Sequence, residues 1–113
     1  GYVEDLGDNA AQAAARAACE MRYNLARSFM NADRYPEAIP ILAELNAAEP
    51  DETRFGTQLA LCYRAVGDTP ALRELVEKLR ETRTRLAAQA EAEIGKLREV
   101  ARERREARRA ERE

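Results

Sequence analysis

Apolar residues recur at helical spacing in the first part of the chain. An alanine-rich run from Asn9 to Ala32 carries them every three or four residues, and alanine has the highest helix propensity. We predict a helix over this run, with Asp8 as its N-cap and residues 1–8 as a lead-in or linker. The stripe expected to face a core consists of Ala18, Cys19, Met21, Leu25, Phe29 and Ala32.

Proline marks a second, shorter helix. A turn near Asp33, a residue type that tolerates left-handed backbone, leads into a helix that begins at Pro36 and ends near Ala48. Pro40 removes one backbone donor just past the first turn, so we expect a small irregularity there and no break. The buried face of this helix is predicted to hold Ala38, Ile41, Leu42 and Leu45.

A third helix is predicted to start at Asp51 or Glu52. It stops at Gly67, because glycine suits the left-handed conformation that ends helices. Thr69 and Pro70 then restart the chain as N-cap and first helical residue. The apolar residues of the third helix are Phe55, Leu59, Cys62, Tyr63 and Val66.

From Ala71 to Glu113 no proline occurs, and the pattern predicts one helix of about 40 residues, about 60 Å long. Its first half has one apolar face, while residues 87–113 are rich in Arg and Glu and are expected to be a solvated extension. An alternative is that this half pairs two chains into a homodimer. The spacing of its apolar residues is not a sustained heptad, so the coiled-coil signal is weak. The candidate self-association residues are Leu86, Ile94, Leu97 and Val100.

The chain matches itself when it is shifted by 34 residues. The matched pairs include Leu25 with Leu59, Ala26 with Ala60, Phe29 with Tyr63, and Pro36 with Pro70. Each unit reads as helix, short turn, helix, and a period near 34 with that content indicates a repeat array. Because one unit cannot bury its apolar face alone, we expect the two units to stack.

These residues and their spacing resemble the tetratricopeptide repeat (TPR) family, with one unit over residues 19–52 and a second over 53–86. The resemblance implies an all-α fold: antiparallel helical hairpins of a TPR-like solenoid with four helices, spanning residues 9–86, and a long C-terminal helix. Arg22 and Gly56 stand where the family has tryptophan, and Thr84 replaces the closing proline of the second unit. The positions that carry the likeness are Leu25, Ala26, Phe29, Ala38, Leu42 and Pro50 in the first unit, and Leu59, Ala60, Tyr63, Gly67 and Asp68 in the second.

The resemblance also implies a concave binding face on the first helix of each unit. By position, that face holds Tyr23, Arg27, Asn31, Arg54, Thr57 and Arg64. Because a guanidinium binds a carboxylate bidentately, the face suits an acidic or carboxylate-ended segment of a protein or peptide partner. The alternative is that these are ordinary solvated helix residues or lie under a neighbouring helix. The family's chaperone-binding carboxylate clamp is not reproduced, since Tyr23 and Arg27 stand where it uses Lys and Asn.

Composition narrows the chemistry. The 113 residues include no His and two Cys, so zinc and iron–sulfur ligands are almost absent and a His-containing catalytic triad cannot form. We therefore predict a non-catalytic module with no metal and no cofactor. Cys19 and Cys62 read as two small buried hydrophobes, or alternatively as one disulfide. No stretch reaches the roughly 18 consecutive apolar residues of a spanning helix, so we predict no membrane span.

Charge is unevenly distributed. Residues 1–70 carry 6 basic and 11 acidic groups, whereas residues 71–113 carry 13 basic and 10 acidic groups. The basic excess in the second part is small, and no aromatic residue is interleaved with the arginines after Arg98 for stacking on bases. We do not expect this chain to bind nucleic acid.

The opening residues Gly1-Tyr2-Val3-Glu4 have no initiating methionine, and we expect the chain to be a piece of a longer protein. They resemble the segment that closes the catalytic domain in certain bacterial alkaline-phosphatase-superfamily proteins, the sulfatases and type I phosphodiesterases. That resemblance implies a second alternative, in which the chain is a non-catalytic C-terminal appendage of such an enzyme.

Overall fold

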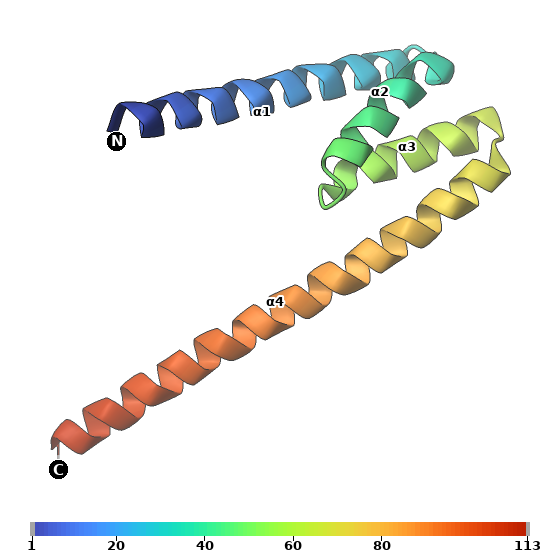
Figure 1. The fold of residues 1–113 in the computed structure, drawn as a ribbon. Coiled ribbons are helices and arrows are strands. Elements are labelled where there is room, and N and C mark those ends of the chain that lie inside the picture. Colours follow the sequence, from blue (N-terminus) through green and yellow to red (C-terminus); the bar gives the residue numbers. More distant parts are fainter. Residues whose placement is uncertain (1, 113) are drawn as a thin grey trace. The chain divides into compact units, whose positions relative to one another are not determined.

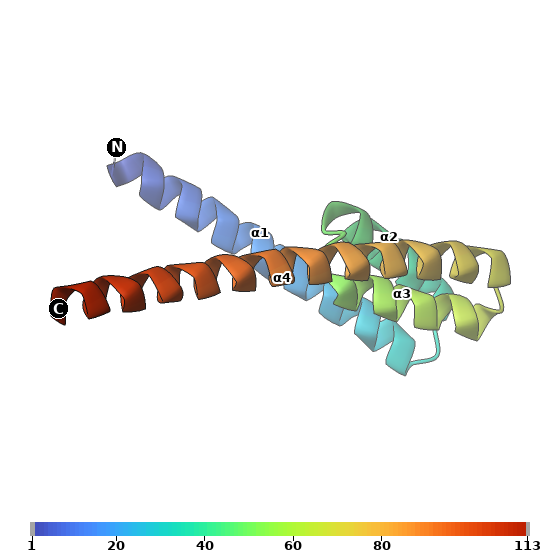
Figure 2. The same cartoon turned by 90° about the horizontal axis from the view of Figure 1, so that it is seen from below.

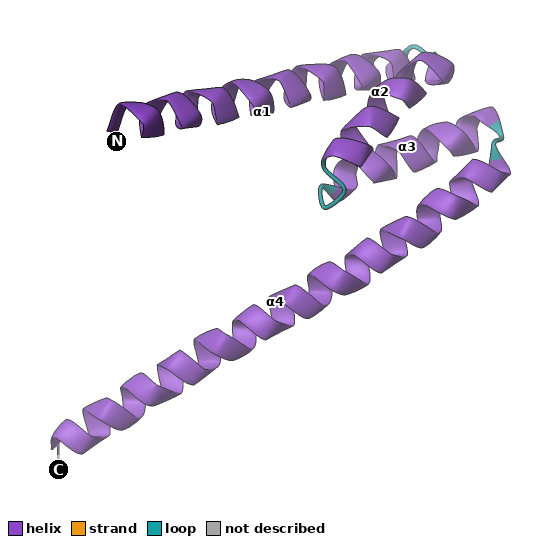
Figure 3. Cartoon of the chain, in the orientation of Figure 1, coloured by secondary structure: helices purple, strands orange, loops and turns teal. Residues whose placement is uncertain are grey.

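A computed structural model describes the backbone of residues 2–112 and the side chains of residues 7–112. Its four α-helices are α1 (Tyr2–Asn31), α2 (Tyr35–Ala48), α3 (Thr53–Val66) and α4 (Thr69–Arg112), joined by short turns (Figures 1 and 3). No strand occurs in the described range, so the predicted all-α class is confirmed. Helix α2 packs against both α1 and α3, as expected of consecutive antiparallel hairpins. The chain divides into two compact units, the first ending at Leu79 and the second beginning at Arg80.

Helix α1 begins earlier than predicted. The N-cap assignment of Asp8 is wrong, because α1 starts at Tyr2 and Asp8 lies inside it. Of the expected lead-in, residue 1 lies outside the described residues, and residues 2–8 are helical. Gly7 costs about 1 kcal/mol relative to alanine in a helix interior. The strong helix formers that follow it outweigh that cost.

The turns follow the predicted chemistry, with one exception. Asp33 has φ of 59° and Gly67 has φ of 77°, which are the left-handed conformations expected at these two helix ends. The N-cap of α4 is Asp68 and not Thr69: Asp68 Oδ1 accepts a hydrogen bond from the Ala71 backbone N–H at 3.2 Å. Helix α2 continues through Pro40, as predicted.

The core of the first unit lies between α1, α2, α3 and the first turns of α4. On α1 the predicted buried stripe is wrong in part: Met21 is 72% exposed and Leu25 is 50% exposed. The buried side chains of α1 are instead Tyr23 and Ala26. Helix α1 has apolar residues on two faces, and periodicity cannot tell which one meets a neighbour. The buried hydrophobic residues are Tyr23, Ala26, Ala38, Leu42, Leu45, Phe55, Leu59, Cys62 and Leu75.

Gly56 lets α3 approach its neighbours closely. A Cβ at this position would lie 2.5 Å from Leu79 Cδ2 and 3.1 Å from Asn46 Oδ1. The space that a larger residue would need at Gly56 is therefore filled by Leu79 of α4. At the equivalent place in the first unit, Arg22 forms an ion pair with Glu44 of α2. The two positions where the TPR pattern has tryptophan are therefore occupied differently: a neighbouring leucine fills the space at Gly56, and an ion pair forms at Arg22.

The second compact unit, which begins at Arg80, consists of the remainder of α4, and this helix continues unbroken to Arg112 (Figure 2). Leu86, where we expected the repeat domain to end, belongs to this unit and is half-buried. From residue 87 to residue 112 every side chain is exposed, as expected of a solvated extension. Arg102 and Glu99 form an i,i+3 ion pair at 4.0 Å within it.

Candidate functional site

Side chains of α1 and α3 meet at equivalent positions of the two repeat units. Arg54 Nη1 donates a hydrogen bond to Glu20 Oε2 at 3.2 Å, and Arg54 Nη2 donates to Glu20 Oε1. Glu20 and Arg54 are 34 residues apart, which is one repeat period. The same helix position in successive repeat units is therefore joined by a bidentate ion pair.

The Tyr23 ring lies beneath two guanidinium groups. The Cζ atom of Arg54 lies 4.9 Å from the ring centroid and that of Arg27 lies 5.9 Å from it, both within cation–π range. Arg27 Nη1 also donates a hydrogen bond to the Tyr23 hydroxyl at 3.3 Å. Phe55 completes the cluster, with its ring 5.4 Å from the Tyr23 ring and tilted by 57°. Packing between α1 and α3 thus holds the Tyr23 ring in the core, while its hydroxyl accepts a hydrogen bond from Arg27.

The ion pair shifts the pKa of both partners. The hydrogen bond from Arg54 lowers the pKa of Glu20, and the hydrogen bond to Glu20 raises the pKa of Arg54. The Arg54 Nε is shielded from solvent and has no hydrogen-bond partner, although it lies 3.6 Å from Glu52 Oε1. Arg54 is therefore occupied by the protein's own carboxylates and has little capacity left for those of a ligand.

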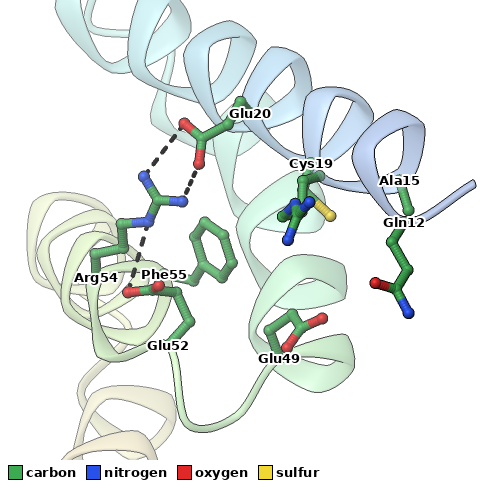
Figure 4. Close-up of a pocket in the computed structure, with 9 residues that line it drawn as sticks. Gln12, Ala15, Cys19, Glu20, Glu49, Glu52, Arg54 and Phe55 are labelled. Atoms are coloured by element: carbon green, nitrogen blue, oxygen red, sulfur yellow. Dashed lines mark hydrogen bonds and ion pairs between the residues drawn. The ribbon is translucent and has the colours of Figure 1, made fainter. Parts of the chain in front are cut away.

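A groove of about 560 Å³ opens beside this ion pair, between α1, the α2–α3 turn and the start of α3 (Figure 4). Glu20 and Arg54 form one side of the groove, and Cys19, which also lines it, is half-buried. The groove contains three carboxylates and two guanidinium groups, so it carries a small negative charge. Its lining residues are Gln12, Ala15, Arg16, Cys19, Glu20, Glu49, Glu52, Arg54 and Phe55.

The structure brings together half of the binding residues predicted from the sequence. Tyr23, Arg27 and Arg54 share one cluster, with Tyr23 buried. Thr57 and Arg64 are exposed on the same face of α3 as Arg54, since they follow it at helical spacing. The Thr57 hydroxyl donates to the Thr53 carbonyl at 2.8 Å. The sixth residue, Asn31, is exposed at the C-terminal end of α1, outside the cluster.

Sequence reasoning missed the residues at the N-terminal end of the groove. Gln12 and Arg16 lie upstream of the first repeat unit, and Glu49 lies in the α2–α3 turn. No motif links them, because they come together only when α1 extends past the repeat and α2 folds back toward it. A longer α1 is the one signal that could have indicated a groove here.

The apolar residues predicted for self-association are unevenly exposed. Leu86 is half-buried, whereas Ile94, Leu97 and Val100 are all exposed on α4. No contact among the described residues covers these last three side chains.

Both cysteine thiols are free, and burial raises the pKa of Cys62. Within residues 7–112 no group of three or more His, Cys, Asp or Glu side chains is placed to hold a metal ion. None of the described helices is sufficiently long and apolar to cross a membrane. Comparison of the chain with protein-family models, with curated proteins and with solved structures gave no significant match.

Proposed function

We propose that this chain is a non-catalytic, TPR-like docking module that binds a segment of a partner protein along the paired faces of α1 and α3. One observation carries the proposal: the Glu20–Arg54 ion pair sets equivalent positions of two helices side by side. The exposed residues that follow Glu20 on α1 and Arg54 on α3 form the surface on which we propose that the partner segment binds. A surface of this kind presents side chains from two rigid helices to an extended or helical ligand.

The charges on this surface favour an acidic partner segment. Arg54 is occupied by Glu20 and Glu52, but no carboxylate among residues 7–112 pairs with Arg27 or Arg64. Leu61 lies on the same face of α3 and is exposed. Two guanidinium groups without a carboxylate partner, one of them on the same face of α3 as Leu61, suit a ligand with Asp or Glu near a large apolar residue.

A displayed library of random peptides tests this proposal. We expect selection on the immobilised chain to enrich peptides that combine acidic and apolar residues. Binding of the best peptide, measured by fluorescence anisotropy, should weaken at least about tenfold in the double variant Arg27→Glu, Arg64→Glu, since two charge-assisted contacts are lost.

The matched control is Arg73→Glu, which reverses an exposed charge on α4 in the same unit. It should leave peptide binding unchanged, and circular dichroism should show that both variants remain folded. Equal binding by the wild-type chain and the double variant would rule out this face as the ligand site.

A further inference from the structure

Helix α1 has a second apolar face that the first unit leaves uncovered. At 3.6 residues per turn, the eleven residues on an arc of about 120° between Gly7 and Ala32 include no charged side chain. In the chain as a whole, 35% of residues are charged. The arc lies roughly opposite the face with Tyr23 and Ala26, and all but Phe29 of its residues are exposed. Its central members are Ala10, Ala14, Ala17, Ala18, Met21 and Leu25.

The second repeat unit indicates what covers such a face. Shifting by 34 residues places Met21 on Phe55 and Leu25 on Leu59. Phe55 is 2% exposed and Leu59 is 3% exposed, whereas Met21 and Leu25 are 72% and 50% exposed. Helix α2 precedes α3 and packs against it in the antiparallel sense (Figure 1), and the Phe55 ring also contacts the Tyr23 ring of α1. The equivalent face of α1 therefore fits an antiparallel helix of the same type as α2.

The chain itself contains a helix of that type with uncovered apolar residues. The first turns of α4 form the second helix of the second repeat unit, just as α2 forms the second helix of the first repeat unit, since Pro70 aligns with Pro36. Beyond the first unit, α4 exposes Ile94, Leu97 and Val100. These residues are preceded by small ones, Ala87 and Ala90.

The sizes of the side chains match in one direction only. Along α1 the arc changes from small residues, at Ala10 to Ala18, to the large Met21 and Leu25. Along α4 the stripe beyond Leu86 also changes from small to large, from Ala87 to Leu97. An antiparallel pair therefore sets the large residues of each helix against the small residues of the other, which is how helix surfaces interdigitate. The repeat equivalence and the side-chain sizes give the same orientation.

We infer that the charge-free face of α1 binds the exposed apolar stripe of α4 from a second copy of this chain, in the antiparallel sense. Each copy carries both faces, so the contact can form twice about a two-fold axis. A single helix pair buries little of the roughly 1,200–2,000 Å² found in stable interfaces, and the reciprocal contact doubles that area. The interface uses a face of α1 away from Arg27 and Asn31, so it is independent of the proposed peptide site.

Sedimentation equilibrium of the full chain tests the inference. We expect a species of twice the 12.7 kDa chain mass at micromolar to millimolar concentration. The variants Met21→Glu with Leu25→Glu, and Ile94→Glu with Leu97→Glu, should each weaken dimerisation at least about tenfold, because each places charge in an apolar contact. The controls Asn9→Glu on α1 and Ala92→Glu on α4 substitute exposed residues on other faces and should dimerise as the wild type does.

Mixing two variants tests the orientation. Ala14→Lys with Leu97→Glu should associate more tightly than either variant alone, since the antiparallel pairing opposes a lysine and a glutamate. A mixture of the Leu25→Lys and Leu97→Glu variants should not associate more tightly than either variant alone. A chain that stays monomeric throughout would overturn the inference. So would a dimer that depends on the α4 residues but not on the α1 residues, because that result indicates α4–α4 pairing.

Discussion

The two parts of α4 have the same backbone geometry but are stabilised by different interactions. Up to Leu79, the helix packs against the core: Leu75 is 6% exposed and Leu79 fills the space over Gly56. From residue 87 to residue 112 no side chain is buried, and Leu97 is 63% exposed. The first part is held by burial of apolar area, and the second by helix propensity and weak side-chain pairs. Secondary structure alone therefore does not reveal which segments carry the stability of the fold.

The largest effect expected from this contrast is in a pair of leucine truncations. Leu75→Ala should lower the free energy of unfolding by about 2–5 kcal/mol, because it removes buried methyl groups and leaves a cavity. Leu97→Ala should change it by no more than about 0.5 kcal/mol, because its side chain is exposed. Urea unfolding followed by circular dichroism, at a concentration where the chain is monomeric, gives both values. Equal losses would contradict the division of α4 into a packed part and a solvated part.

A smaller loss is expected from filling the space at Gly56. Gly56→Leu should destabilise the first unit by about 1–3 kcal/mol, because Leu79 and Asn46 leave no room for the new side chain. Gly56→Ala should cost less, since the end of the Leu79 side chain can move and alanine favours the helix. Thermal unfolding of the two variants checks this order. A Gly56→Leu variant as stable as the wild type would show that Leu79 does not lie against α3.

In the solvated part of α4, substitution of a glycine should stabilise the helix instead of destabilising it. Gly95→Ala meets no atom within 4 Å of its new Cβ, so only the gain in helix propensity remains, about 1 kcal/mol. Backbone amides around residue 95 should exchange with solvent up to about fivefold more slowly. Hydrogen exchange followed by mass spectrometry measures this, with the amides of α2 as an internal reference. Faster exchange would indicate a close contact at Gly95.

The smallest effect concerns the Glu20–Arg54 pair. Because the hydrogen bond from Arg54 lowers the pKa of Glu20, this carboxylate should titrate below its ordinary value of 4.5. Its stabilising contribution is therefore present above pH 4.5 and is lost as the pH falls through the lowered value. Carbon-detected NMR titration of Glu20 should show the shift, and Arg54→Gln should return the midpoint toward 4.5. A midpoint that is the same in both proteins would mean that the pair does not form in solution.

Local sequence was sufficient for the helices and turns. Proline near the start of α2, the left-handed Asp33 and Gly67, and the long proline-free run of α4 all act within a few residues of themselves. The predicted start of α1 was wrong because a single glycine is too weak a signal to stop a helix. The N-cap of α4 was wrong because Asp68 and Thr69 are both good capping residues, and only the geometry of the turn selects Asp68.

The candidate site was predictable only in part, for a different reason. The 34-residue period relates Glu20 to Arg54, but only the structure shows that these two residues meet and that Arg54 lies over the Tyr23 ring. The period could not show that Arg54 is already paired, or that Gln12, Arg16 and Glu49 line a groove beside it. Those facts depend on distances between elements far apart in the chain.

By itself the sequence determined four helices, their turns and a repeat of 34 residues, because these depend on backbone conformations set by near neighbours. Only the tertiary structure decided which of the two apolar faces of α1 is buried, since both have the same period. Tyr23 and Ala26 are buried, and Met21 and Leu25 are exposed, because of where the neighbouring helices pack against α1. Burial depends on how all the helices pack together, so it cannot be predicted from the hydrophobic period of one helix.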